Sequence, residues 1–312
     1  MHYKTKNCFF IYCPQYRTLS VIRNNVNNNQ RAIDYHIMVI TPEEIQESLF
    51  YTEFVQYTDQ ESIYLMKQKF PENCELVLYT DYFQDTDENK YRCAVITDSI
   101  NKKIIFAIEG TRPGVTIEAF YDLIDNYNIA RNIPPPKFTQ VKILNDIILD
   151  NIEYDGEDLR NWRFLFTGHS LAGYLSHISA SHIATKLHER NCLIKGKIIS
   201  VAFEEPGAKK MVDIIYKNAE LDPNRASDDI EFLNINNKSN FINNFSDHIG
   251  PVWQIYKTDK DESYPAYEYL YKVNLLRQIQ DHRLSNFIDV IRYRKGMLKD
   301  EEGNIVNIKE AE

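Results

Sequence analysis

A single serine between glycines carries the clearest chemical signal in the sequence. Residues 164–177 read FLFTGHSLAGYLSH, so Ser170 follows an apolar run and precedes a helix-length stretch without proline. A serine between small residues at a strand-to-helix turn presents its hydroxyl at the end of the strand, which suits it as a nucleophile. Ala172 stands where the strict pattern has its second glycine, and Gly173 follows it. The spacing predicts acyl transfer through Ser170.

Acyl transfer also needs a site for the developing oxyanion. Two N–H donors aimed at the carbonyl oxygen stabilise its negative charge. The N–H of Leu171, directly after the serine, is one such donor. The second is expected after an earlier strand, and the run IIFAIEGTRPG at 104–114 ends a predicted strand in Gly110 and Thr111. We expect Leu171 and Thr111 to form this site, although an ordinary turn is the competing interpretation of Thr111.

These groups must be positioned by alternating strands and helices. Residues rich in β-formers occupy 74–84, 91–114 with DSIN as a hairpin turn, 163–167, 197–203 and 230–235, whereas 138–152 and 171–188 have helical length and spacing. Such alternation predicts an α/β fold with a mostly parallel sheet covered by helices on both faces. Sites on these sheets lie at the carboxyl ends of the strands. The predicted turn at Ser170 is at such an end.

The first 75 residues are expected to form an accessory segment with a helical part. The polar run NNVNNNQ at 24–30 predicts a loop. At 41–57 the sequence starts as a helix should, with Thr41 as N-cap, Pro42 in the first helical position and Glu44 completing a capping box. We therefore predict a helical N-terminal extension to the sheet domain.

Composition restricts the classes of protein to which the chain can belong. With 312 residues, 43% of them hydrophobic, it has the composition of a globular protein, and a single α/β domain often reaches this size. The net charge of −9 argues against a nucleic-acid partner, which would require a basic stripe. The five cysteines have no metal-ligand or redox spacing, so we interpret them as reduced packing residues.

The N-terminal run CFFIYC is too short for a secretory signal or a membrane span. We expect the protein to be cytoplasmic, or exported without a classical signal peptide. No transmembrane span is expected, and transient contact with a membrane surface is compatible with the sequence.

Several short motifs, taken in order, resemble one known family. AIEGT, a helix carrying Asp122, FLFTGHSLAG, VAFEEPG, HIGPVWQIY and DHRLSNF resemble the landmarks of the fungal-type class 3 lipases of the α/β-hydrolase superfamily. The most specific of them is TGHSLAG. The resemblance implies an α/β-hydrolase domain over 76–292, after an accessory segment 1–75 and before a polar C-terminal tail 293–312. It implies a lid within 112–137.

The resemblance also implies roles for individual residues. Ser170 is then the nucleophile, Thr111 and Leu171 form the oxyanion hole, and His282 in DHRLSNF is the general base.

The general base can also be sought among the histidines themselves. In α/β-hydrolases it follows the nucleophile and the acid along the chain. The histidines of the helix after Ser170 are expected to point away from it and to serve in packing or solvation: His177, His182 and His188. His248 lies in a loop before a last strand, where a structural hydrogen bond is expected. His282 precedes the predicted final helix LSNFIDVIRY and is our candidate base.

The acid is the residue on which the sequence departs from the family. An aspartate is expected after the strand at 230–235, but the sequence reads NINNKSNFIN, with Asn240 at about that position. Asparagine can orient an imidazole but cannot stabilise its charged form by charge. Glu205, at the end of the preceding strand in VAFEEPG, is our first candidate, followed by its neighbour Glu204 and by Asp247.

The resulting hypothesis is a serine carboxylic ester hydrolase of lipase or phospholipase A type. Its substrate would be a lipid or a smaller soluble ester, and neither a cofactor nor a metal is expected. The segment 117–130 has only a loose amphipathic pattern, and NIPPPKFTQ at 132–140 replaces the family's His-x-Gly-Phe segment. Because the aspartate is missing, a catalytically impaired fold that serves as a binding module is the first alternative. An acyltransferase, which would share the acyl-enzyme, is the second.

Overall fold

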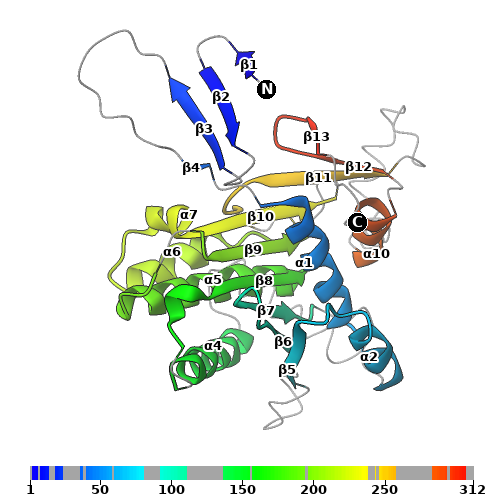
Figure 1. Cartoon of the computed structure of the whole chain (residues 1–312), viewed down its shortest axis with the longest axis vertical. Coiled ribbons are helices and arrows are strands. Elements are labelled where there is room, and N and C mark those ends of the chain that lie inside the picture. Colours follow the sequence, from blue (N-terminus) through cyan, green and yellow to red (C-terminus); the bar gives the residue numbers. More distant parts are fainter. Residues whose placement is uncertain are drawn as a thin grey trace. The chain divides into compact units, whose positions relative to one another are not determined.

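The computed structural model contains the whole chain in two compact units, Met1–Thr41 and Pro42–Glu312 (Figure 1). It describes residues 2–5, 8–13, 18–23, 36–37, 40–57, 60–80, 92–110, 136–154, 157–193, 196–237, 243, 246–257, 283–293 and 296–306. Each unit is considered by itself.

The smaller unit is a sheet of four antiparallel strands. In spatial order these are β1 (His2–Thr5), β2 (Cys8–Cys13), β3 (Thr18–Arg23) and β4 (His36–Ile37). The runs CFFIYC and TLSVIR are rich in aromatic and β-branched residues, which favour strands. A helical character of the N-terminal extension is thus not confirmed over these residues, whereas the helix predicted at 41–57 is present as α1 (Pro42–Phe54).

The larger unit is built on a nine-stranded sheet (Figure 1). Its strands are β5 (Cys74–Thr80), β6 (Cys93–Asp98), β7 (Lys103–Ile108), β8 (Arg163–His169), β9 (Ile198–Phe203), β10 (Ile230–Asn236), β11 (Val252–Lys257), β12 (Gly296–Lys299) and β13 (Ile305–Val306). The spatial order follows the chain order. Strands β7 to β11 are parallel to one another, and antiparallel strands flank them on both sides. This arrangement confirms the predicted α/β class.

Helices cover the sheet on both faces. They are α1 (Pro42–Phe54), α2 (Gln60–Lys67), α4 (Pro136–Tyr154), α5 (Leu171–Glu189), α6 (Lys209–Asn218), α7 (Ala226–Asp229), α10 (Leu284–Phe287) and the π-helix η3 (Ile288–Arg292), with 3₁₀ turns η1 (Leu159–Asn161) and η2 (Pro223–Arg225). Side chains alternate between the faces of a strand. Phe166 of β8 accordingly packs in the core with α4 and α5, while the Thr167 hydroxyl donates to the Ser48 carbonyl of α1 at 3.2 Å.

The main core lies between the sheet and the α4–α5 layer. The rings of Phe106 and Phe166 stack with centroids 4.6 Å apart, and Leu175 and Ile178 of α5 are fully buried beside the sheet. Each such side chain stabilises the fold by roughly 1.5–3 kcal/mol. This packing fixes α5, and with it the turn that precedes α5, against the centre of the sheet.

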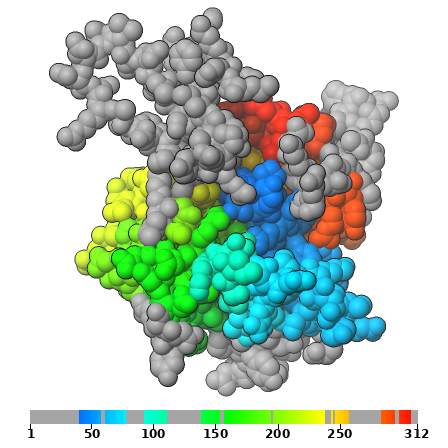
Figure 2. Space-filling view, in the orientation of Figure 1, coloured from blue at the N-terminus to red at the C-terminus, as the bar shows by residue number. Residues whose placement is uncertain are grey.

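Two segments depart from the predicted boundaries of the sheet domain. Helices α1 and α2, within the predicted accessory segment 1–75, belong to the larger unit. The predicted polar tail 293–312 contributes β12 and β13 to its sheet. Figure 2 shows α1 in blue close to the C-terminal residues in orange, and an ion pair of 2.6 Å joins Arg292 to Glu53. Within the described residues, none of the helices has both the length and the apolar composition for crossing a bilayer.

Candidate active site

Ser170 occupies the turn between β8 and α5. Its backbone has φ 61° and ψ −130°, a conformation that costs a non-glycine residue about 1–3 kcal/mol and is concentrated at functional sites. The Ser170 N–H donates to the Phe203 carbonyl of β9 at 2.8 Å, which fixes the turn to the neighbouring strand. Serine is a favoured N-cap residue, yet the Ser170 side chain makes no capping hydrogen bond to α5. Helix capping therefore does not explain this serine.

Two glycines allow the helix to begin close to the strand ends. A Cβ atom added to Gly168 would lie 2.5 Å from the Ala172 carbonyl oxygen. One added to Gly173 would lie 2.8 Å from Cβ of Glu205. Both approaches are closer than carbon atoms tolerate in a packed interior. The strand, sharp turn and helix thus follow in the order predicted from the sequence, and the methyl group of Ala172 is accommodated.

The loop after β7 reaches the same turn. A Cβ atom on Gly110 would overlap the His169 carbonyl and lie 3.8 Å from Cβ of Ser170. Leu171 is the first residue of α5, so its N–H is one of those without an acceptor inside the helix. Thr111, directly after Gly110, is outside the described residues, and so is most of the proposed lid segment, 111–135.

Glu205 is paired with a histidine, but with His248. Its Oε1 atom forms a short hydrogen bond with Nδ1 of His248, and its Oε2 atom accepts the Gly207 N–H at 2.8 Å. The Glu205 side chain is fully buried. His282, the predicted base, lies outside the described residues, as does Asn240. The sequence-based expectation of a structural hydrogen bond for His248 is confirmed.

Both ring nitrogens of His248 face acceptors. Nδ1 faces the Glu205 carboxylate, and Nε2 lies 2.9 Å from the main-chain oxygen of Asn243. The Asn236 amide is 3.3 Å from Nε2. The oxygen of this amide has no hydrogen-bond partner among the described residues. If the amide is turned by 180°, that oxygen faces Nε2 of His248 and can accept a hydrogen bond from it. An imidazole that donates from both nitrogens is the charged imidazolium.

Electrostatics favour the same charged form. Burial lowers the pKa of His248, but the hydrogen bond and negative charge of Glu205, together with the Asn243 carbonyl and the charge of Glu204, raise it above its ordinary value overall. A general base must offer a lone pair to the serine hydroxyl. Both ring nitrogens of His248 are engaged in this arrangement, and the assignment of the base to His282 stays a prediction.

Glu204 differs from Glu205 in its surroundings. It follows Phe203, whose partner in the parallel ladder is His169, so Glu204 and Ser170 each come directly after the end of one of two adjacent strands. Its Oε2 accepts the Asn237 N–H at 2.6 Å and its Oε1 accepts from the Asn243 side chain at 2.8 Å. Glu204 is fully buried. Its φ of 56° is positive, like the φ of 61° at Ser170.

The third acid candidate does not belong to this buried cluster. Asp247 is exposed, and its main-chain carbonyl accepts the Lys209 N–H at 3.0 Å. Asn243, by contrast, was not singled out in the sequence. Nothing distinguishes it from the other asparagines of NINNKSNFINNF, because its role arises from contacts with Glu204 and His248 that only the fold creates.

The histidines of α5 serve in packing, as predicted. His177 is fully buried between the Ser200 hydroxyl, at 2.7 Å, and the Asn234 side-chain oxygen, at 2.9 Å. Burial lowers the pKa of His177, which keeps it neutral. His182 forms a hydrogen bond with Asp146 of α4 at 2.9 Å. These contacts attach α5 to its neighbours on both sides.

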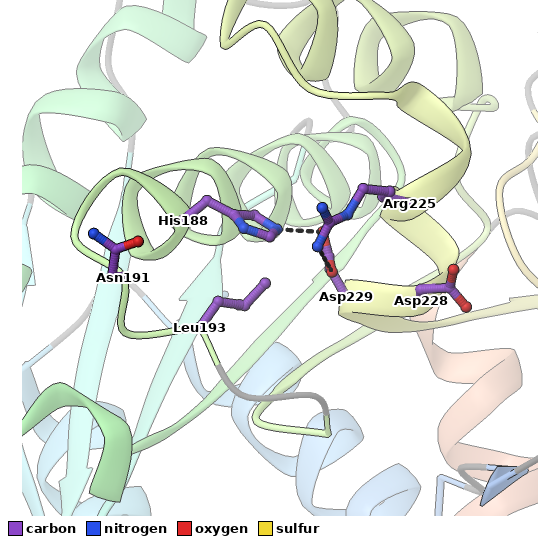
Figure 3. Close-up of a pocket in the computed structure, with 6 residues that line it drawn as sticks. All are labelled: His188, Asn191, Leu193, Arg225, Asp228 and Asp229. Carbon is purple, nitrogen blue, oxygen red and sulfur yellow. Dashed lines mark hydrogen bonds and ion pairs between the residues drawn. The ribbon is translucent and has the colours of Figure 1, made fainter. Parts of the chain in front are cut away.

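A separate pocket of about 580 Å³ lies at the far end of α5 (Figure 3). His188, Asn191, Leu193, Arg225, Asp228 and Asp229 line it. Figure 3 shows His188 and Arg225 directed at Asp229, with 2.7 Å between Nε2 of His188 and Oδ2 of Asp229. At 1.5 Å per helical residue, His188 is about 27 Å from Ser170. This pocket is therefore remote from the turn at Ser170.

Comparison with known proteins gives the same resemblance as the motifs. No family model and no curated protein sequence matches the chain. Among solved structures, the chain is similar to the Rhizomucor miehei lipase–propeptide complex (14% identity, 69% of both chains, TM-score 0.43) and to Lip2 lipase from Yarrowia lipolytica (16% identity, 69% of this chain and 80% of that one, TM-score 0.42). It is also similar to lipase II from Rhizopus niveus (13% identity, 78% and 94%, TM-score 0.43). The solved structures to which the chain is similar are thus fungal class 3 lipases.

Proposed function

We propose that the protein is a serine carboxylic ester hydrolase that forms an acyl-enzyme on Ser170. The observation that carries this proposal is the strained backbone of Ser170 at the junction of β8 and α5, where the hydroxyl does not cap the helix. Strain of this kind persists only where the surrounding structure enforces it. Here the hydrogen bond to Phe203 and the close approach at Gly168 enforce it.

The proposed reaction uses side chains and backbone of this chain alone. His282 takes the proton of the Ser170 hydroxyl as its oxygen attacks the ester carbonyl, and the Leu171 and Thr111 N–H groups stabilise the oxyanion. The C–O bond to the alcohol then breaks, and the imidazolium returns its proton to the leaving oxygen. Water deprotonated by the same imidazole releases the acid and regenerates Ser170.

A carboxylate is required to orient the imidazole and to stabilise its charge. Two candidates, Glu204 and Glu205, are buried at the carboxyl end of β9. The substrate is proposed to be a lipid or a smaller soluble ester. The resemblance to lipases favours a lipid, which would be reached by transient contact with a membrane surface.

The test combines a covalent probe with a series of substrates. A fluorophosphonate probe should label the wild-type protein and fail to label Ser170→Ala, because the probe reacts with an activated serine. p-Nitrophenyl esters of increasing acyl length should be hydrolysed by the wild type, and the preferred length separates a lipase from a small-ester hydrolase. As a control, Ser176→Ala, on the helix after the turn, should be labelled normally.

Two outcomes would favour the alternative functions. Equal labelling of the wild type and Ser170→Ala, or none of either, would favour a binding module without catalysis. Normal labelling with faster transfer of the acyl group to an added alcohol than to water would identify an acyltransferase.

A further inference from the structure

We propose that the two buried glutamates have separate roles, an inference that rests on the proposed function. Glu205 is the permanent counter-ion of a protonated His248. Glu204 is the carboxylate that orients the catalytic imidazole. His248 is thus a positioning residue that acts on Glu204 through Asn243.

The first step in this inference is a count of charges. Glu204 and Glu205 are adjacent and both are fully buried. Burying one carboxylate is expensive unless it is paired and hydrogen-bonded, and two neighbouring carboxylates also repel each other. His248 is the group that can supply one positive charge, because each of its ring nitrogens lies within hydrogen-bond distance of an acceptor oxygen, the Glu205 carboxylate for Nδ1 and the Asn243 carbonyl for Nε2. In its protonated form His248 makes the pair with Glu205 neutral overall, and Glu204 is the second carboxylate at this strand end, with its own hydrogen bonds from Asn237 and Asn243.

The second step is the position of each carboxylate. The Glu205 side chain leaves the strand toward α5, since its Cβ is the atom that a methyl group on Gly173 would meet. It lies beneath the first turn of the helix. Glu204 and Ser170 directly follow Phe203 and His169, the last pair of the parallel ladder, and the Glu204 carboxylate is held at the end of β10 by the Asn237 N–H. Glu204 therefore lies at the strand ends, where sites on parallel sheets are found.

The third step is the connection between the two carboxylates. His248 donates from Nε2 to the Asn243 main-chain oxygen at 2.9 Å, and the Asn243 side chain donates to Oε1 of Glu204 at 2.8 Å. A carboxylate has about four acceptor positions. Two of these positions on Glu204 accept the Asn237 and Asn243 donors, and we assign a further one to the catalytic imidazole. Fixing Asn243 fixes the direction of the Glu204 carboxylate.

The backbone supports the assignment to Glu204. It has φ 56°, a left-handed conformation that is uncommon for a residue with a long side chain. A glycine would adopt this conformation at no steric cost. Ser170 and Glu204, each directly after the last residue of its strand, both have this left-handed φ.

The groups that face His248 come from several elements. Glu204 and Glu205 face it from the end of β9, Asn236 from β10 and Asn243 from the following loop. His177 of α5 is near enough for its own pKa to be lowered by His248. The carboxylates outweigh this neutral histidine, so the positive charge on His248 is favoured from the strand side.

Three variants test the division of roles by kinetics. Glu204→Gln should lower kcat for p-nitrophenyl ester hydrolysis by about 10⁴-fold, as removing the carboxylate of a serine triad does. The double variant Glu205→Gln/His248→Gln keeps neutral hydrogen-bonding groups at both positions. It should lower kcat by only about 10- to 100-fold, as the loss of a supporting partner does in other sites. The matched control His188→Gln/Asp229→Asn removes a similar pair about 27 Å away and should leave kcat unchanged.

The pH profile adds a readout that a purely structural pair would not move. Glu204→Gln should remove the pH dependence assigned to the catalytic imidazole or shift it, whereas the double variant should keep it. A 10⁴-fold loss in the double variant with its melting temperature preserved would overturn the inference, and so would near-normal activity of Glu204→Gln.

A second measurement does not depend on activity. The ring nitrogens of His248, assigned in ¹⁵N NMR spectra by their loss in His248→Gln, should still be mostly protonated at pH 6.5, the ordinary pKa of histidine. Glu205→Gln should lower the pKa of His248. A mostly neutral His248 at pH 6.5 would overturn the inference even if Ser170 proves to be the nucleophile. Failure of Ser170 labelling would instead refute the proposed function and leave this result to stand or fall by itself.

Discussion

Replacing Gly173 with alanine tests how closely α5 approaches the end of β9. An added Cβ would lie 2.8 Å from Cβ of Glu205, 3.1 Å from Cβ of Ala202 and 3.3 Å from the Gly168 oxygen. Carbon atoms in proteins pack best at about 3.5–4.0 Å. The first two contacts involve short, backbone-anchored atoms that cannot rotate away. The helix or the strand end must therefore move by several tenths of an ångström.

Two effects of opposite sign compete in this variant. Helix propensity alone predicts that alanine stabilises a helix interior by about 1 kcal/mol relative to glycine. Overpacking of a tight interior costs about 1–3 kcal/mol. Because three contacts are too short at once, we expect the overpacking cost to lie in the upper half of its range, about 2–3 kcal/mol, which leaves a net destabilisation of about 1–2 kcal/mol. At about 2–4 °C per kcal/mol, this corresponds to a fall in Tm of about 2–8 °C.

The displacement should also affect the turn at Ser170, which is three residues before Gly173 and accepts the Gly173 N–H at 2.9 Å. A misplacement approaching 1 Å can cost about 10²-fold in rate. Thermal unfolding and fluorophosphonate labelling of Gly173→Ala should therefore both change. The control is Gly303→Ala, where φ is +83° but no atom lies within 4 Å, so only backbone strain and no loss of labelling is expected. A raised Tm with normal labelling of Gly173→Ala would refute the close approach of α5.

Three other predictions concern buried polar groups. The Thr167 hydroxyl of β8 lies 2.7 Å from the Thr52 hydroxyl of α1. Thr167→Val removes this partner of Thr52 and should destabilise the protein by about 1–3 kcal/mol in chemical denaturation. The double variant Thr52→Val/Thr167→Val should recover part of the loss. Burial and the nearby Glu44 raise the pKa of Glu231 to about 7 despite Arg163. Folding therefore favours the protonated form of Glu231. The contribution of this carboxyl group to stability is lost as the pH rises from about 4.5 through 7. Glu231→Gln should accordingly raise the free energy of unfolding by about 1–2 kcal/mol at pH 8 and leave it unchanged at pH 4, and equal effects at both pH values would contradict this. The pKa of His248 is raised in the folded state. The stability supplied by its pairing with Glu205 is therefore complete below about pH 6.5 and is lost as the pH rises through the folded pKa. The difference in unfolding free energy between the wild type and Glu205→Gln/His248→Gln should accordingly shrink with rising pH.

The sequence alone determined the elements that carry local signals. The apolar run before Gly168, the small residues around Ser170 and the helical spacing after it predict a strand, a turn and a helix, and the structure contains β8 and α5 at these positions. The turn at DSIN could also be predicted from the sequence, because its hydrogen bond is local: the Asp98 carboxylate accepts the Asn101 N–H at 2.9 Å within the same four residues. Interactions between residues close in the chain depend little on the rest of the fold, which is why such patterns are informative.

The partners of the buried carboxylates were decided only by tertiary structure. Glu205 and His248 are 43 residues apart, and the sequence held two histidines that could reach the end of β9. Which one pairs with Glu205 depends on how β10 and the following loop return to the sheet. The difference between Glu204 and Glu205 has the same origin: adjacent residues beyond a strand end meet different elements, α5 for one and the end of β10 for the other. Charge pairing over long separations is set by the packing of the elements, and the local sequence carries no record of it.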